Sequence, residues 1–331
     1  MHYLHHTSQS ATSAAGQGWR APTHGAPVRP RSAPPRPASV PPATRPRSIS
    51  TRAVDHSARL GYTGGMDDLD IERIACQIFA AGRDRTRFTP LRGDDAPATL
   101  DETYPIQARV YALYEAAADA GPLGGHKIAL TSKAVQELCG IDTPAYGAVF
   151  RDEVRAAPVT LRRSDFVHLG LEFEVIVTMA ADVPSADAPY DPDSIADYIE
   201  ACAPAFEIIE DRNADYGDLD AKSVVADRCW CYGAVHGPWV TNWRTLNLAA
   251  LPVKLYWNGK AVDRAVTGAS MGHPFAGLAW VANHLCARGR TLAKGEIVMT
   301  GSALKTRFPE TGDHVRYVIE GLGETELRIE A

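Results

Sequence analysis

Two glutamates separated by one residue are the part of this sequence best suited to chemistry. Glu172 and Glu174 lie in the segment Leu171–Met179, where apolar residues occupy every second position, as in a β-strand. Side chains alternate across a strand, so both carboxylates project from one face, about 7 Å apart. Two acids in an apolar strand are costly to bury without a cation, and oxygen ligands suit Mg²⁺ or Mn²⁺. The spacing therefore predicts a metal site.

A third acid could complete that site. Glu207 lies in the apolar segment Pro204-Ala205-Phe206-Glu207-Ile208-Ile209, and a strand is predicted over residues 205–210. A carboxylate on a neighbouring strand would give the three oxygen ligands that a hard divalent ion accepts. The alternative is that Glu207 forms an ion pair with Arg212 or another basic residue at the end of a strand. The sequence leaves both interpretations open.

Two further residues are candidates for proton transfer. Lys127 lies in the largely apolar stretch 125–132, where it could neutralise a substrate carboxylate, or act as an acid–base group if burial lowers its pKa. The alternative is a lysine that extends to solvent from a strand edge. Asp142 follows a predicted short helix, within a Gly-Ile-Asp-Thr-Pro segment whose ordinary role is to form a turn.

Helical spacing and strand patterns indicate what must position these residues. Helices are predicted over 67–81, 103–120 and 132–139, from Asp191-Pro192, and from His273-Pro274 to about residue 288. Proline is favourable at a first helical position, so His273 is interpreted as a helix cap rather than a catalytic base. Strands are predicted over 296–300, 313–320 and 324–330. Helices first and interspersed strands later indicate an α+β fold.

Composition excludes several classes of protein. The 331 residues are 45% hydrophobic, enough for one large domain or two smaller ones, and no apolar run is long enough to span a membrane. Six dispersed cysteines predict a reduced, cytoplasmic protein, and Cys229-Trp230-Cys231 lacks the second ligand pair of a zinc site. Residues 1–54 contain seven arginines and no acid, so the remainder is more acidic than the whole. Non-specific binding to nucleic acid is therefore not expected.

The first 65 residues differ from the rest. They are rich in Pro, Ser, Ala and Arg without hydrophobic periodicity, which predicts a disordered extension before a single catalytic domain over 66–331, helical in its N-terminal part (66–125). Met66 could be the true start. A functionally silent tail and an organelle-targeting segment are the alternatives, although the repeated prolines oppose an amphipathic targeting helix.

The order of short motifs resembles the 2-keto-4-pentenoate hydratase / 4-oxalocrotonate decarboxylase family of the fumarylacetoacetate hydrolase superfamily. The resemblance covers about residues 67–331. The first motif is Gly-His-Lys-Ile-Ala-Leu-Thr-Ser-Lys-Ala-Val-Gln at 125–136. The others follow in the family's order: Asp142 with Pro-Ala-Tyr-Gly at 144–147, the Glu-x-Glu strand, residues 204–209, Val-Ala-Asp at 225–227, Gly-His-Pro at 272–274, 279–283, Thr-Gly-Ser at 300–302, and Gly-Asp at 312–313.

The resemblance implies a fold, a cofactor and a substrate class. It implies a mixed, rolled β-sheet with packed N-terminal helices, in a protein that forms homo-oligomers. It implies Mg²⁺ or Mn²⁺ held by Glu172, Glu174 and Glu207, and small 2-oxo or 2-hydroxydienoic acids of catechol meta-cleavage as substrates. Lys127 matches the family's lysine, expected to contact the substrate carboxylate or to assist proton transfer. Ser302 matches a position near the substrate pocket.

The chain departs from the family pattern in two motifs. Ala145 stands where many hydratases carry an aspartate, and Arg228 and Trp230 stand where small or neutral residues are usual. If Arg228 faces the pocket, it could bind a second substrate carboxylate as a bidentate partner. Lys222 is a further substrate-binding candidate. The departures leave the substrate open.

Four functions remain from the sequence. Hydration of a 2-hydroxydienoate is favoured, and decarboxylation of 2-oxo-3-hexenedioate is the alternative within the same fold. Hydrolysis of an acylpyruvate would need a His–Glu pair near the pocket, for which residues 126–150 offer no clear counterpart. A non-catalytic partner subunit would have no reason to keep buried acids, so metal binding separates it from the enzymes.

Overall fold

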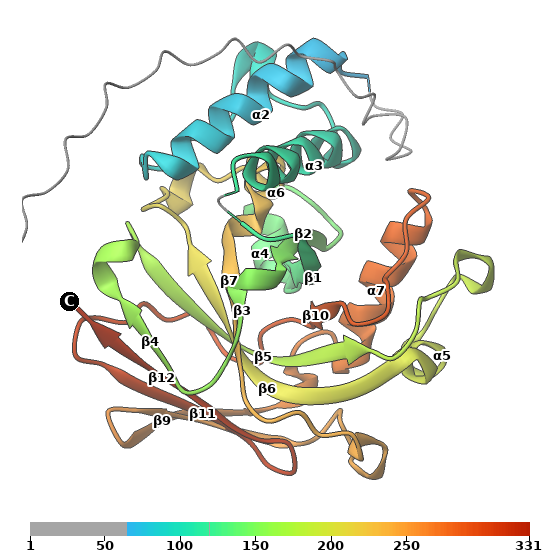
Figure 1. The fold of residues 1–331 in the computed structure, drawn as a ribbon, viewed down its shortest axis with the longest axis vertical. Helices are drawn as coiled ribbons and strands as arrows, with labels where there is room; N and C mark the ends of the chain where they lie inside the picture. The colour runs from blue at the N-terminus through green and yellow to red at the C-terminus, as the bar shows by residue number, and fades with distance from the viewer. Residues whose placement is uncertain (1–64, 119) are drawn as a thin grey trace, which may run out of the picture. The chain divides into compact units, whose positions relative to one another are not determined.

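A seven-stranded mixed sheet carries the predicted acids, and a five-stranded sheet packs against it (Figure 1). The computed structural model describes residues 65–118 and 120–331, which belong to one compact unit. The strand order is β2-β1-β10-β5-β6-β7-β3 in the larger sheet and β4-β12-β11-β8-β9 in the smaller one. The α+β class is confirmed, while the second sheet was not predicted.

The larger sheet contains β1 (Leu123–Ala129), β2 (Ala145–Phe150), β3 (Val154–Ala156), β5 (Leu169–Met179), β6 (Ile199–Glu210), β7 (Cys231–His236) and β10 (Ile297–Met299). The smaller sheet contains β4 (Val159–Arg162), β8 (Pro252–Trp257), β9 (Lys260–Val266), β11 (His314–Ile319) and β12 (Gly323–Glu330). The helices are α2 (Asp68–Arg83), α3 (Leu100–Ala116), α4 (Lys133–Leu138), α5 (Pro192–Ile195), α6 (Ala221–Ala226) and α7 (Pro274–Cys286).

The larger sheet is strongly rolled. Strands β1 and β6 are separated by β10 and β5, so a flat sheet would hold them about 14 Å apart. Lys127 Nζ on β1 nevertheless lies 2.8 Å from Glu207 Oε1 on β6. Gly147 of β2 also lies close to the backbone of Arg228. A Cβ added to Gly147 would be 2.5 Å from the Arg228 carbonyl oxygen. Curvature and long side chains together close the gap, and the predicted roll of the sheet is confirmed.

A side chain caps the first turn of each α-helix in the described part of the chain. Asp67, Thr99, Ser132, Asp191, Asp220 and His273 each accept a hydrogen bond from a backbone N–H of the following turn. His273 Nδ1 accepts from Phe275 N–H at 2.9 Å, ahead of Pro274 in the first turn of α7. The interpretation of His273 as a cap is confirmed.

The predicted bounds of one helix and one strand were wrong. Helix α3 begins at Leu100 rather than residue 103, because Thr99 caps it, and ends at Ala116, since Ala118 adopts a left-handed conformation (φ 55°). Strand β6 begins at Ile199 rather than residue 205. Pairing with β5 extends β6 through Pro204, a residue that is usually excluded from central strands.

The apolar face of β5 forms the core that supports the acids. Its alternate residues Leu171, Phe173, Val175, Val177 and Met179 are each no more than 3% exposed, as the alternation predicted. Phe173 and Phe206 meet Tyr317 of the smaller sheet, with ring centroids 5.7 and 6.3 Å from the tyrosine ring. The smaller sheet therefore packs against β5 and β6 on the face opposite the glutamates.

The N-terminal helices form a smaller apolar cluster with α6. Figure 1 shows α2 and α3 lying side by side, and their buried contacts are those of Ile74 and Ile78 with Ile106 and Val110. In the described part of the chain, no helix combines the length and apolarity needed to cross a membrane. The predicted disordered extension, with its alternatives of a later start, a silent tail and a targeting segment, lies outside the described residues, except for Gly65.

Because His126 on β1 is buried, we expect the free energy of unfolding to decrease in acid. Burial, and then the charge of Arg290, lower the pKa of His126 to about 3, below the value near 6.5 expected in the unfolded chain. The unfolded chain therefore binds the extra proton below pH 6.5, and stability falls as the pH decreases. Between pH 6.5 and 5 this residue alone removes about 2 kcal/mol at most from the free energy of unfolding. Urea unfolding at both pH values should show a smaller loss for His126→Asn than for the wild type. The same loss in both proteins would contradict the prediction.

Candidate metal centre

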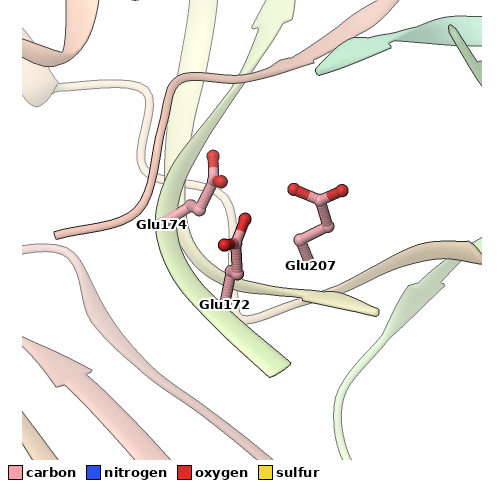
Figure 2. A group of neighbouring side chains, drawn as sticks. All are labelled: Glu172, Glu174 and Glu207. Carbon is pink, nitrogen blue, oxygen red and sulfur yellow. The ribbon is translucent and has the colours of Figure 1, made fainter. Parts of the chain in front are cut away.

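Three glutamates converge on one side of the rolled sheet. Glu172 and Glu174 project from β5, and Glu207 from β6, where it is the direct antiparallel partner of Glu172 (Figure 2). One carboxylate oxygen of each residue lies within 4.8 Å of the others. The predicted three-carboxylate arrangement is therefore present in the structure.

The carboxylates are buried and incompletely hydrogen-bonded. Glu174 and Glu207 are fully buried, whereas Glu172 is half-buried. Within the described residues, Glu174 Oε1 and Glu207 Oε2 have no hydrogen-bond partner. A buried carboxylate oxygen without a donor is costly unless a cation satisfies it. An all-oxygen donor set of this kind fits a hard divalent ion.

The charge of the cluster is compensated only in part by Lys127. Three ionised carboxylates and one ammonium leave two negative charges, which a divalent cation would balance. Burial, and then the neighbouring glutamates, raise the pKa of Glu174 well above its usual range. Burial raises the pKa of Glu207 to about 7 against the opposing effect of Lys127. These shifts show that it is electrostatically costly to keep the three carboxylates ionised without a divalent cation.

Lys127 is an interior residue. It lies on β1 between β2 and β10 and is 3% exposed, so the interpretation as a lysine at a strand edge was wrong. Burial lowers its pKa, but Glu207 and Glu172 more than offset this effect and raise the pKa above its usual range. While those carboxylates are ionised, Lys127 is held as an ammonium, with a proton next to the cluster.

Glu207 does not pair with Arg212, the base named in the alternative interpretation. Arg212 Nη2 lies 2.8 Å from Asp227 Oδ2, and its Nε donates to the Thr86 carbonyl. Glu207 Oε1 lies 2.8 Å from Lys127 Nζ instead. Its carboxylate belongs to the cluster with Glu172 and Glu174 (Figure 2). Arg212 lies beyond the end of β6 with a φ of 46°, so the alternation of the strand no longer sets the direction of its side chain.

The loop after β10 orients two of the three carboxylates. Gly301 N–H donates to Glu174 Oε2 at 2.7 Å, and Thr306 Oγ1 donates to Glu172 Oε1 at 2.6 Å. Ser302 Oγ accepts from Phe173 N–H and donates to the Leu304 carbonyl, both at 2.8 Å, so its hydroxyl anchors this loop to β5. Sequence reasoning missed Thr306, since no motif marked it, and noted Gly301 only as part of a motif.

Removal of the Thr306 hydroxyl tests whether this loop prepares the centre. We expect Thr306→Val to weaken Mg²⁺ or Mn²⁺ binding about tenfold, because an outer hydrogen bond that fixes a ligand typically contributes this much. Isothermal titration calorimetry would measure the affinity, with Thr245→Val, whose hydroxyl bonds only the Asn242 carbonyl, as the matched control. Equal affinities in both variants would show that Thr306 does not orient Glu172.

Arg228 is not placed for the predicted contact with substrate. It is 5% exposed, its Nη2 lies 2.9 Å from Glu153 Oε1, and the same nitrogen donates to the Cys231 carbonyl. Its guanidinium carbon is 4.7 Å from the centre of the Phe150 ring. The charge is thus already paired and enclosed by aromatic rings, so the structure contradicts a role in binding a second carboxylate. Trp230 likewise packs edge-on against Phe88, at 5.0 Å.

Because Arg228 is buried and paired, we expect its replacement to cause a large loss of stability. Arg228→Met leaves Glu153 without its cation, and breaking a buried pair in this way typically costs about 3–5 kcal/mol. Thermal unfolding should detect the loss, whereas metal affinity of the folded fraction should stay within about twofold. A normal stability with a changed substrate preference would restore the original interpretation.

The segment that holds Arg228 is strained next to the centre. Arg228, Cys229 and Trp230 have φ values of 57°, 50° and 59°, three successive non-glycine residues in the left-handed region. Each such residue costs about 1–2 kcal/mol. Burial raises the pKa of the Cys229 and Cys231 thiols on either side of this turn, and the charges of Glu207 and Lys127 shift it in opposite directions. No zinc-type cluster forms there among the described residues.

The remaining predicted site residues are not joined to the cluster by any contact seen in the described residues. Asp142 is exposed in the turn between α4 and β2, and its carbonyl oxygen lies 3.5 Å from Lys133 Nζ. Lys222 is half-buried on α6, after the Asp220 cap. The roles of Asp142 in catalysis and of Lys222 in substrate binding stay predictions.

The rolled sheet and its cluster of three glutamates, two of them fully buried, are the features of a divalent-metal enzyme. The chain belongs to the Fumarylacetoacetate (FAA) hydrolase C-terminal family, which matches residues 146–330, more than half of its length. The resemblance found in the motifs is thereby confirmed.

Similar proteins include hydratases and a decarboxylase. The chain is 28% identical over 261 residues to a 2-hydroxyhexa-2,4-dienoate hydratase of Comamonas testosteroni, covering 78% of this chain and 97% of that protein. It is 30% identical over 207 residues to a 4-oxalocrotonate decarboxylase of Pseudomonas putida, covering 62% and 76%. The solved 4-oxalocrotonate decarboxylase of Pseudomonas putida G7, complexed with magnesium and adipate, has the same fold, with a TM-score of 0.74 and 24% sequence identity. The superposition covers 81% of this chain and 100% of that one.

Proposed function

We propose that this protein is a divalent-metal-dependent lyase that hydrates a small 2-hydroxydienoate, or its 2-oxoenoate form, to a 4-hydroxy-2-oxo acid. The observation that carries the proposal is the buried cluster of Glu172, Glu174 and Glu207 with its excess of negative charge. Similarity to dienoate hydratases over nearly their whole length supports the reaction type. The solved relative bound to magnesium supports Mg²⁺ or Mn²⁺ as the ion.

The chain's own residues divide the work. The three glutamates hold the ion, which when bound supplies a Lewis acid for the 2-oxo acid end of the substrate. Thr306 and Gly301 keep two of those glutamates in fixed orientations. Lys127 places an ammonium beside Glu207, where it can neutralise a substrate carboxylate and pass a proton to the carbon chain. Hydration needs one proton at C5 and one water at C4, and Lys127 is the proposed source of the proton.

Decarboxylation is the second candidate. The similarity to a 4-oxalocrotonate decarboxylase supports it, because the same acid cluster can serve loss of CO₂ from 2-oxo-3-hexenedioate. Both reactions build negative charge on the oxygen at C2, so the glutamates and Lys127 do not discriminate between them. A non-catalytic subunit is not favoured, since it would bear the cost of two fully buried acids without a use for them.

The test is an assay of both reactions on the full chain with Mg²⁺ or Mn²⁺. For the hydratase, we expect the ultraviolet absorbance of fresh 2-hydroxypenta-2,4-dienoate to decrease with time. A chelator of divalent ions should abolish this decrease. Release of CO₂ from 2-oxo-3-hexenedioate without turnover of the dienoate would show that the function is decarboxylation and not hydration. A protein that binds no divalent ion would contradict both. Light scattering would test the proposed homo-oligomer in the same samples.

A further inference from the structure

The strained turn at residues 228–230 brings Trp230 to the wall of the glutamate cluster. Gly147 of β2 is the direct partner of Lys127 on β1, so a side chain at this position would project from the same face as the lysine. A Cβ added to Gly147 would lie 3.3 Å from the Cβ of Cys229, the residue before Trp230. The turn therefore packs on the face of the sheet from which Lys127 projects, and Trp230 is its last residue.

The indole also lies beside the strand that carries Glu207. Trp230 belongs to a small apolar cluster with Phe88, Val224 and Ile209. Ile209 follows Glu207 by two residues on β6, so the two side chains share one face of the sheet. This apolar cluster therefore bounds the metal centre where β6 continues beyond Glu207.

Two aromatic rings fix the orientation of the indole. The Phe88 and Tyr216 rings meet Trp230 edge-on, with centroids 5.0 and 6.1 Å away. Tyr216 belongs to the electrostatic surroundings of the centre, because burial and the charge of Asp211 raise its pKa and the charge of Glu172 adds to the shift. Trp230 is thus held in place between the apolar cluster and a ring that responds to a glutamate of the centre.

The indole N–H of Trp230 has no acceptor. The residue is 9% exposed, and its Nε1 is buried without a hydrogen-bond partner among the described residues. An indole nitrogen only donates, and a buried donor that is left unsatisfied costs free energy. The left-handed backbone of the three residues that end at Trp230 adds strain to this cost. Strain of this kind concentrates at ligand-binding sites.

A metal ion cannot satisfy this donor. Glu174 Oε1 and Glu207 Oε2 are also buried without partners, and a cation would satisfy both. A cation accepts no hydrogen bond, so the N–H of Trp230 needs an oxygen that arrives with a ligand. The indole nitrogen is as enclosed as those two carboxylate oxygens. An acid that reaches an ion held by the glutamates therefore enters the same interior.

We propose that Trp230 Nε1–H donates a hydrogen bond to a carboxylate oxygen of the 2-oxo acid bound at the glutamate cluster, and so fixes the direction in which its carbon chain leaves the ion. The inference rests on the proposed function, because it takes the acid end of the substrate to lie at the metal. Lys127 supplies charge from β1, whereas Trp230 supplies a neutral, directed hydrogen bond from the turn before β7. Trp230 is a substrate-binding residue with no part in proton transfer.

Nuclear magnetic resonance of the full chain labelled with [15N]tryptophan tests the hydrogen bond directly. The six tryptophans give six indole N–H signals, each assigned by replacing one tryptophan with phenylalanine. The probe is 2-oxopentanoate, which lacks the double bonds needed for turnover. With Mg²⁺ present, it should move the Trp230 indole proton downfield, and further than that of any other tryptophan, because a charge-assisted hydrogen bond forms. Mg²⁺ alone should not produce this displacement.

Trp230→Phe measures what the N–H contributes to binding, because phenylalanine keeps an aromatic ring but has no donor. In calorimetry, affinity for 2-oxopentanoate with Mg²⁺ should fall about tenfold or more, while Mg²⁺ affinity should stay within about twofold. The matched control is Trp243→Phe. Trp243 Nε1 is also buried without an acceptor among the described residues, but its ring packs on Phe275 of α7, at 5.1 Å. Both affinities of this control should equal those of the wild type.

The outcomes separate this inference from the proposed function. If bound 2-oxopentanoate leaves the Trp230 signal in place, or if Trp230→Phe binds it as tightly as the wild type, the role of Trp230 is overturned and the proposed function stands. If Trp230→Phe does not fold, the wild-type signal still decides, since variants at the other tryptophans assign it by elimination. If the wild type binds no 2-oxo acid in an Mg²⁺-dependent way, the proposed function fails and the inference fails with it.

Discussion

Glu174→Gln is expected to abolish turnover while leaving the metal-free protein at least as stable as the wild type. The substitution removes a metal ligand, so Mg²⁺ affinity should fall by at least about 100-fold. It also removes one of three carboxylates whose oxygens lie within 4.8 Å of each other. Relief of that repulsion should raise the free energy of unfolding by about 1 kcal/mol without metal. The glutamine can still accept from Gly301 N–H, so the loop after β10 should keep its place.

Calorimetric titration with Mg²⁺ and urea unfolding in a chelator would measure the two opposite effects. Glu200→Gln is the matched control, because Glu200 is an exposed glutamate on β6 and should change neither quantity. Retained Mg²⁺ affinity in Glu174→Gln would place the ion elsewhere. A loss of stability comparable to that of a core substitution would show that Glu174 acts mainly in packing.

Lys127→Met is expected to lose activity as well, but, unlike Glu174→Gln, to lose stability with it. The apolar replacement keeps most of the volume but leaves Glu207 without its cation, 2.8 Å from the lost nitrogen. Breaking a buried ion pair by removing one partner costs about 3–5 kcal/mol. Divalent metal should restore part of that loss, since it supplies positive charge to the same carboxylates. Turnover should fall by about 10²–10⁴, the usual contribution of an acid–base group.

Thermal unfolding with and without Mg²⁺, followed by the dienoate assay, would check each part. Lys133→Met serves as control, since Lys133 is exposed on α4 and its nitrogen bonds Gln136 at 3.2 Å. If Lys127→Met were as stable as the control, the ion pair with Glu207 would contribute little. If it retained turnover, the proposed proton would have to come from another group.

The two variants separate the roles that one cluster combines. Glu174 is expected to trade stability for metal binding, as functional residues often do. Lys127 is expected to serve both, because the cost of its burial is offset only by the carboxylates it neutralises. A further contrast comes from Arg228, an equally buried cation that pairs with Glu153 and should affect stability alone.

Local periodicity was sufficient to predict part of the centre. The alternation along Leu171–Met179 placed Glu172 and Glu174 on one face, because side-chain direction in a strand depends only on residue parity. Caps were equally local: His273 ahead of Pro274 was read correctly from two adjacent residues. The motif order was enough to identify the family and to name Glu207 and Lys127, though not to show what they contact.

Tertiary structure decided everything that depends on strands meeting across the sheet. The register Glu172 to Glu207 and the roll that brings Lys127 from β1 to β6 arise from pairing between segments far apart in sequence, which no local pattern encodes. The same reason explains the errors and omissions. Arg228 turns to Glu153 and not to the pocket, and Thr306 bonds Glu172 from a segment that shares no motif with it. By itself, therefore, the sequence determined the family and the residues proposed for the metal centre, and only the folded sheet decided which of them lie together.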